Sequence, residues 1–156
     1  MKQWVTGSGY VVHQVMGGAW NVYALAHEED MLLIDTGRRY RWNTLHNRIE
    51  NLRFRSSPRA LILTHTHFDH AENAARLKAA YPLKLIVHRS EEDFLKAGDS
   101  PLANGTILPT RLLMCFVKGL VQSRFRYQGV QADFVVDGRL DLDPFGFEAG
   151  CSGLTP

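Results

Sequence analysis

The chain has 156 residues, of which 45% are hydrophobic and 22% are charged, and its formal net charge is +2. This length supports one hydrophobic core, so we expect a single domain over residues 1–156. The small net charge excludes a strong general attraction to nucleic acid or to a membrane surface.

The first part of the chain predicts antiparallel strands. Residues 10–15 are rich in β-forming side chains and are followed by a Gly-Gly pair. Residues 21–26 and 31–35 are apolar runs joined by a short polar turn, which predicts a hairpin. Asp35 ends the second run, where the local sequence is compatible with an ordinary turn residue ahead of Thr36-Gly37.

Residues 41–53 predict an amphipathic helix, because Trp42, Leu45, Ile49 and Leu52 recur at helical spacing. The other face of this helix is basic. Seven arginines lie between residues 38 and 59, against the single acid Glu50: Arg38, Arg39, Arg41, Arg48, Arg53, Arg55 and Arg59. Such a run suits phosphate contact, but it is more typical of a solvated helix face, so we do not favour nucleic-acid binding.

Residues 64–70, T-H-T-H-F-D-H, contain three imidazoles and a carboxylate between a strand pattern and a helix pattern. His65 and His67 are two residues apart, so they project to one side of an extended strand end and could share an ion. Asp69 and His70 come after the turn and could face a second ion. These donors suit Zn²⁺, with Fe or Mn possible if more oxygen ligands join. Chance clustering in a polar loop is the alternative, and the position at a strand-to-helix turn favours the metal site.

A helix pattern over residues 71–80 and a strand pattern over 83–87 follow the metal motif. Together with the strand before the motif they predict a βαβ unit with a right-handed parallel crossover. His88 ends the second strand close to the expected metal edge of the sheet. We interpret His88 as a structural residue.

The H-x-H-x-D-H sequence of residues 65–70 resembles the signature of the metallo-β-lactamase superfamily of metallohydrolases. Residues 31–37, M-L-L-I-D-T-G, resemble the strand and D-T-G that precede the signature in that superfamily. The resemblance places Asp35 beside the metal, where its carboxylate would orient a ligand imidazole; an ordinary turn residue is the alternative. The resemblance implies an α/β (α+β) fold, an αββα sandwich of two similar halves. This chain resembles the first half and the start of the second, so we expect a C-terminally incomplete sandwich.

The resemblance also implies a mechanism and a set of ligands. A metal-bound hydroxide would hydrolyse an ester, thioester, lactam or phosphodiester bond in a small-molecule substrate. His65 and His67 would hold the first ion, and Asp69 and His70 the second. Asp69 would also orient the attacking hydroxide, which makes it the expected catalytic residue.

Residues 91–130 predict a helical insertion, since superfamily members commonly carry variable segments here. It starts with a short helix and continues through a loop to an apolar helix over residues 110–121. We expect it to form a substrate lid or a dimer contact; burial in the core is the alternative. Residues 134–142 then predict a hairpin that opens the second sheet, with a turn at Asp137-Gly138.

The last seven residues resemble the superfamily stretch that carries the next ligand histidine, with Gly153, Thr155 and Pro156 in place and Leu154 where that histidine stands. Leucine cannot bind metal, so we expect one or two zinc sites with partial occupancy. The chain is then either a truncated form of a longer hydrolase or a shortened homologue. The alternative function is a non-catalytic assembly or binding module that keeps the fold and a partial metal site.

We also expect self-association and a cytoplasmic location. A partial sandwich leaves a sheet face and strand edges for a second copy to cover, so we expect a dimer. Cys115 and Cys151 form no C-x-x-C pattern or disulfide framework, which favours the cytoplasm. The first residues lack the apolar segment of a signal peptide, and no stretch reaches transmembrane length.

Overall fold

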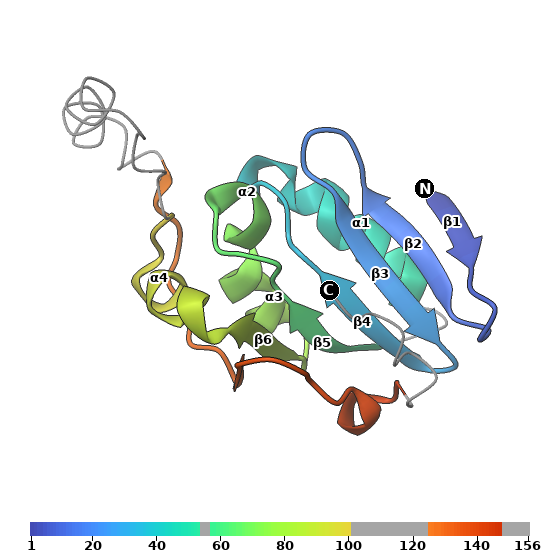
Figure 1. Cartoon of the computed structure of the whole chain (residues 1–156). Helices are drawn as coiled ribbons and strands as arrows, with labels where there is room; N and C mark the ends of the chain where they lie inside the picture. Colours follow the sequence, from blue (N-terminus) through green and yellow to red (C-terminus); the bar gives the residue numbers. More distant parts are fainter. Residues whose placement is uncertain (54–56, 101–124, 148–156) are drawn as a thin grey trace, which may run out of the picture.

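The computed structural model describes residues 1–53, 57–100 and 125–147. Its strands form a seven-stranded sheet. The strands follow one another in sequence order across the sheet (Figure 1). The first four strands pair antiparallel, and β4 to β7 pair parallel. Their bounds are β1 Lys2–Val5, β2 Val11–Met16, β3 Val22–His27, β4 Asp30–Ile34, β5 Ser57–Ile62, β6 Lys84–His88 and β7 Phe134–Val136.

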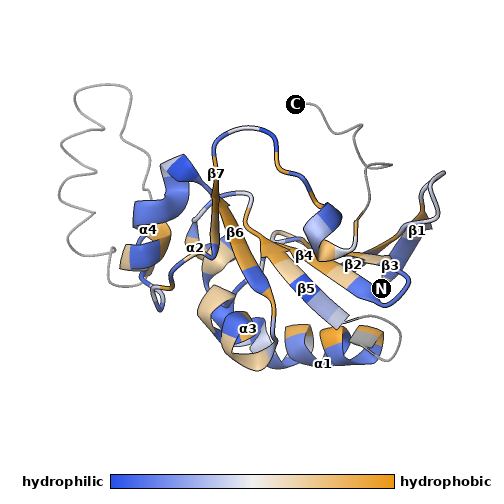
Figure 2. Cartoon of the chain, turned by 90° about the horizontal axis from the view of Figure 1, so that it is seen from below, coloured by the Kyte–Doolittle hydropathy of each residue, from blue (hydrophilic) through white to orange (hydrophobic). Residues whose placement is uncertain are grey.

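Helices cover one face of this sheet. Figure 2 shows α1 and α3 on the same side, while the chain after β7 crosses the opposite side. The helices are α1 Trp42–Arg53, α2 Phe68–Ala71, α3 Ala74–Ala80 and α4 Glu92–Ala97, with 3₁₀ turns at Arg39–Arg41, Arg89–Glu91 and Asp143–Phe145. Among the described residues, no helix is long and apolar enough to cross a bilayer.

The main core lies between the sheet and α1 and α3. Met31 and Leu33 of β4 point into it, together with Leu45 of α1 and Leu77 of α3, and all four are buried. Leu32 lies between Met31 and Leu33 and faces the opposite side of the sheet, because successive side chains along a strand point to alternate faces. β4 is therefore buried on both faces, which explains its uninterrupted apolar sequence.

The prediction that residues 134–142 form a hairpin that opens a second sheet is wrong. β7 joins the existing sheet parallel to β6, with Val135 opposite Val87. The free edge of β6 offers unpaired backbone groups, and the Asp133 carboxylate accepts the Leu85 N–H at 2.9 Å just before the strand starts. Leu140 and Leu142 are not in a strand. They pack instead in a smaller core on the opposite sheet face with Phe145 and Phe147.

Most other predicted elements are confirmed, with two exceptions. No pattern in the sequence predicts β1, and the predicted helix over residues 71–80 is divided into α2 and α3 at Glu72 and Asn73. Asn73 donates its side-chain amide to the carbonyls of Thr36 and Gly37, at 3.0 and 3.1 Å, which ties this break to the end of β4. The helix predicted over residues 110–121 and the position of Leu154 lie outside the described residues, so the insertion stays a prediction.

Candidate metal centre

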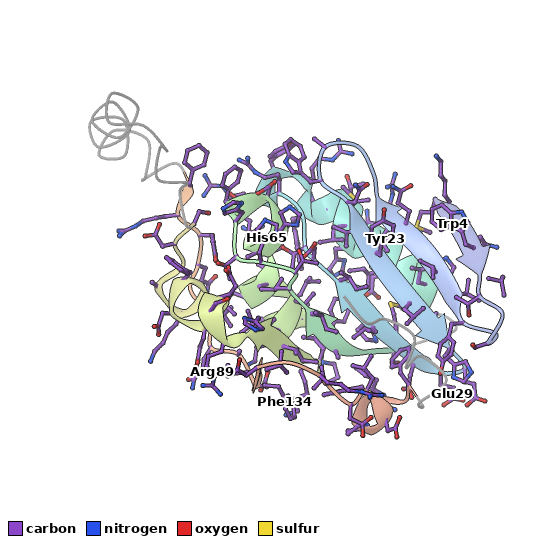
Figure 3. All side chains as sticks on the ribbon, viewed as in Figure 1. Trp4, Tyr23, Glu29, His65, Arg89 and Phe134 are labelled. Carbon is purple, nitrogen blue, oxygen red and sulfur yellow. The ribbon has the colours of Figure 1, made fainter. Side chains whose placement is uncertain are left out.

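The histidine-rich motif lies at the carboxyl edge of the parallel strands. β5 ends at Ile62 and α2 begins at Phe68, so the motif forms the turn between them. Figure 3 shows His65 at the opposite end of the sheet from Glu29. The carboxyl ends of neighbouring parallel strands meet at one edge, where open α/β sheets bind their ligands.

The structure brings the four predicted ligands together. The ring centroids of His65 and His67 are 4.7 Å apart, and those of His65 and His70 are 4.0 Å apart. The Asp69 carboxylate lies 3.5 Å from His70, measured from Oδ2 to Nε2. All four side chains are half-buried. They form one cluster, and their role as metal ligands stays a prediction.

Asp35 anchors both ends of the motif, which matches the orienting role considered for it. Its carboxylate accepts the Thr64 N–H at 2.9 Å and lies 2.8 Å from His70 Nδ1. The hydrogen bond to Asp35 raises the pKa of His70, although burial opposes this effect. Because Nδ1 is engaged, Nε2 is the nitrogen that His70 can offer to a metal. Asp35 adopts a left-handed backbone conformation, with φ of 62°, to reach this position.

Three further side chains hold the middle of the motif, and sequence reasoning missed all of them. Glu91 accepts the backbone N–H and the hydroxyl of Thr66, at 2.8 and 2.5 Å. Ser100 Oγ accepts the Phe68 N–H at 2.7 Å. The Tyr127 hydroxyl donates to the Thr66 carbonyl at 2.9 Å, and burial raises the pKa of this phenol, so it stays a donor.

Zinc chemistry fits the Asp69 and His70 pair. Two donors about 2.0–2.2 Å from one tetrahedral ion are about 3.4 Å apart, close to the 3.5 Å between Asp69 Oδ2 and His70 Nε2. Burial, with a smaller effect from His70 and His67, lowers the pKa of His65 and keeps its ring neutral, the form that binds metal. Within residues 1–53, 57–100 and 125–147, no three His, Cys, Asp or Glu side chains are arranged to hold one ion.

His88 takes the structural role predicted for it. Its side chain is exposed at the end of β6, and Nδ1 accepts the Ser90 N–H at 3.2 Å. This contact caps the 3₁₀ turn at Arg89–Glu91, and so positions Glu91 for its bonds to Thr66.

Comparison with known proteins decides the family. The family model described as "Metallo-beta-lactamase superfamily" matches residues 16–145. This chain belongs to the metallo-beta-lactamase superfamily. The match includes β4, Asp35 and the whole motif, so the fold class implied by the resemblance is confirmed. No curated protein matches the chain.

Solved structures show the same fold. The subclass B3 metallo-beta-lactamase BJP-1 of Bradyrhizobium japonicum is 17% identical, with a TM-score of 0.62 over 82% of this chain and 42% of its own. A Cronobacter sakazakii metallo-beta-lactamase is 19% identical, with a TM-score of 0.63 over 88% and 46%. FEZ-1 from Legionella gormanii is 18% identical, with a TM-score of 0.58 over 76% and 41%. The chain thus spans less than half the length of these relatives.

Proposed function

We propose that this chain is a zinc-dependent hydrolase of the superfamily, or the part of one that carries the first ligands, and that it cleaves an ester, thioester, lactam or phosphodiester. Membership of the superfamily supports metal-dependent hydrolysis at the level of the family. The observation that carries the proposal for this chain is the pairing of Asp69 and His70, with Asp35 fixing the ring that His70 presents.

Each residue has a distinct task in this proposal. His65 and His67 would hold one ion, and Asp69 and His70 a second. Bound zinc polarises the substrate and lowers the pKa of coordinated water. Asp69 is the catalytic residue, because its carboxylate lies beside His70 and can accept a proton or orient an attacking water. Asp35 and Glu91 keep the turn fixed, so that little reorganisation accompanies the reaction.

A non-catalytic assembly or binding module is the second candidate. It is favoured by the arrangement of donors, because the described residues provide two donors around the Asp69 and His70 position and no group of three. Zinc sites that retain their ion have three or four protein ligands as a rule. Metal content and hydrolysis distinguish the two candidates.

The dialysed 156-residue chain is expected to hold well under two zinc ions, measured by elemental analysis. Leu154→His is expected to raise zinc retention, because a third imidazole would convert a two-ligand site into a three-ligand site. Zinc-dependent hydrolysis of generic thioester, lactam or phosphodiester substrates should disappear in His67→Ala.

His27→Ala is the matched control for these measurements, since it removes a half-buried imidazole at the end of β3, far from the motif. It should leave zinc content and hydrolysis unchanged. Hydrolysis that is absent at saturating zinc would support the binding module. Two tightly held ions in the unmodified chain would contradict the expected stoichiometry and would show that further ligands come from elsewhere, with His88 or a partner chain as the candidates.

We also propose that two copies of the chain associate through the β1 edge. β1 pairs with β2 on one side, and its Trp4 and Val5 side chains are 48% and 69% exposed. A two-fold pairing of β1 with its copy would continue the sheet and cover both. Light scattering should give a dimer for the native chain and a monomer for Trp4→Ser; a native monomer would contradict the proposal.

A further inference from the structure

A recess beside the metal motif combines cations with aromatic rings. Its volume is about 150 Å³, and it lies between the loop after β2 and the segment that leads into α1. Its walls include Met16, Trp20, Gly37, Arg38, Tyr40 and Arg41. A larger cavity of about 790 Å³ lies between β1 to β3 and the end of α1, among residues such as His27 and Glu28 at the far end of the sheet from the motif.

Arg38 connects the recess to the motif. Its guanidinium carbon lies 5.6 Å from the ring centroid of Trp20, 5.7 Å from that of Tyr40 and 4.3 Å from that of Phe68. Phe68 stands between His67 and Asp69 in the sequence. A group bound in the recess would therefore lie one aromatic ring away from the metal ligands.

The charge of this region is positive. Glu72, which is buried, accepts Arg38 Nε at 3.0 Å and the Arg39 N–H at 2.7 Å, and Arg39 Nε lies 3.6 Å from its other oxygen. This carboxylate fixes the direction of Arg38 but offsets one charge only. Arg38, Arg39 and Arg41 therefore leave a formal excess of two positive charges over Glu72.

We propose that the recess binds an oxyanion group of the substrate, a carboxylate or a phosphate, with Arg38 and Arg41 as its cations. A guanidinium group suits both anions because it donates two parallel hydrogen bonds. The volume of about 150 Å³ equals the share of about five water molecules at about 30 Å³ each, which is room for a phosphate or a carboxylate group together with bound water. This inference rests on the proposed hydrolase function and narrows its substrates to anionic ones.

NMR titration of the zinc-free, ¹⁵N-labelled chain tests the recess without any hydrolysis. Inorganic phosphate and acetate are added separately at constant ionic strength, with EDTA present. We expect saturable shifts of the Gly17, Gly37 and Tyr40 amides and of the Trp20 indole N–H. Arg41→Gln should weaken binding by about three- to tenfold, the effect of losing one charge-assisted contact.

Arg139→Gln is the matched control, because it makes the same change in charge at an exposed position in the segment after β7. It should bind as the native chain does. Saturation by phosphate alone identifies a phosphate ester, saturation by acetate alone identifies a carboxylate, and both support the recess. No saturation by either anion, or equal affinity in Arg41→Gln, would overturn the inference. Zinc-dependent hydrolysis of a neutral lactone would survive that outcome, so the two proposals fail separately.

Discussion

Asp35→Asn is expected to lower the free energy of unfolding by about 2–4 kcal/mol, because it breaks a buried hydrogen-bonded network. The Asp35 side chain accepts from Thr64 and contacts His70 Nδ1, and the residue is only 5% exposed. Asparagine keeps the shape and tolerates the positive φ, but its amide nitrogen replaces one of the two acceptor oxygens, so either the Thr64 N–H or the His70 Nδ1–H loses its acceptor. Zinc affinity should fall roughly 10- to 100-fold, as expected when the partner of a ligand histidine is lost.

Urea unfolding and competition with a zinc chelator measure the two effects of Asp35→Asn. Asp93→Asn, on the exposed face of α4, makes the same chemical change and should alter stability by no more than about 0.5 kcal/mol. Native stability combined with native zinc affinity in Asp35→Asn would show that the carboxylate does not fix the motif.

Gly98→Ala is expected to destabilise the protein by about 2–5 kcal/mol, from overpacking and from left-handed strain together. Gly98 ends α4 with φ of 65°. A Cβ there would collide with the Tyr127 carbonyl and would lie 2.7 Å from the Gly129 nitrogen. The collision would push away the segment that donates the Tyr127 N–H to Gly98 and the Tyr127 hydroxyl to Thr66. Zinc retention should therefore decrease together with stability.

Gly9→Ala separates the two causes of this destabilisation. Gly9 also has a positive φ, 84°, but a Cβ there meets no atom within 4 Å. Urea unfolding of Gly9→Ala should therefore show the left-handed strain alone, about 1–2 kcal/mol. An equal loss of stability in both variants would contradict the close approach of residues 98 and 127.

Local patterns in the sequence predict the main elements of the fold but not the pairing at its edges. The β-forming side chains of residues 10–15 and the helical spacing from Trp42 to Leu52 correspond to β2 and α1. The run at residues 134–136 is a strand as predicted, but its partner is β6 and not a new hairpin. A strand pattern does not predict which strand it will pair with. Residues 134–136 pair with β6, whose edge is otherwise free.

In the candidate site, too, the sequence predicts what is local and misses what is distant along the chain. The histidines and Asp69 are recognisable because they are close together in the sequence. Glu91, Ser100 and Tyr127 are 25, 32 and 61 residues away from the motif residues that they bind. Nothing in their local sequence distinguishes them from a helix start, a loop serine or a buried tyrosine. Asp35 was found as a candidate because it ends a buried strand that the resemblance to the superfamily places beside the metal.

The distant anchors of the motif have a consequence for the order of folding. Closing each long loop costs conformational entropy that is recovered only when the contacts at its ends form. We therefore expect the motif turn to become ordered late, after β4 and β6 have joined the sheet and the segment around Tyr127 has docked. A metal ion would then bind after the tertiary structure has formed and would not act as an early template, because the turn that presents Asp69 and His70 depends on those distant contacts.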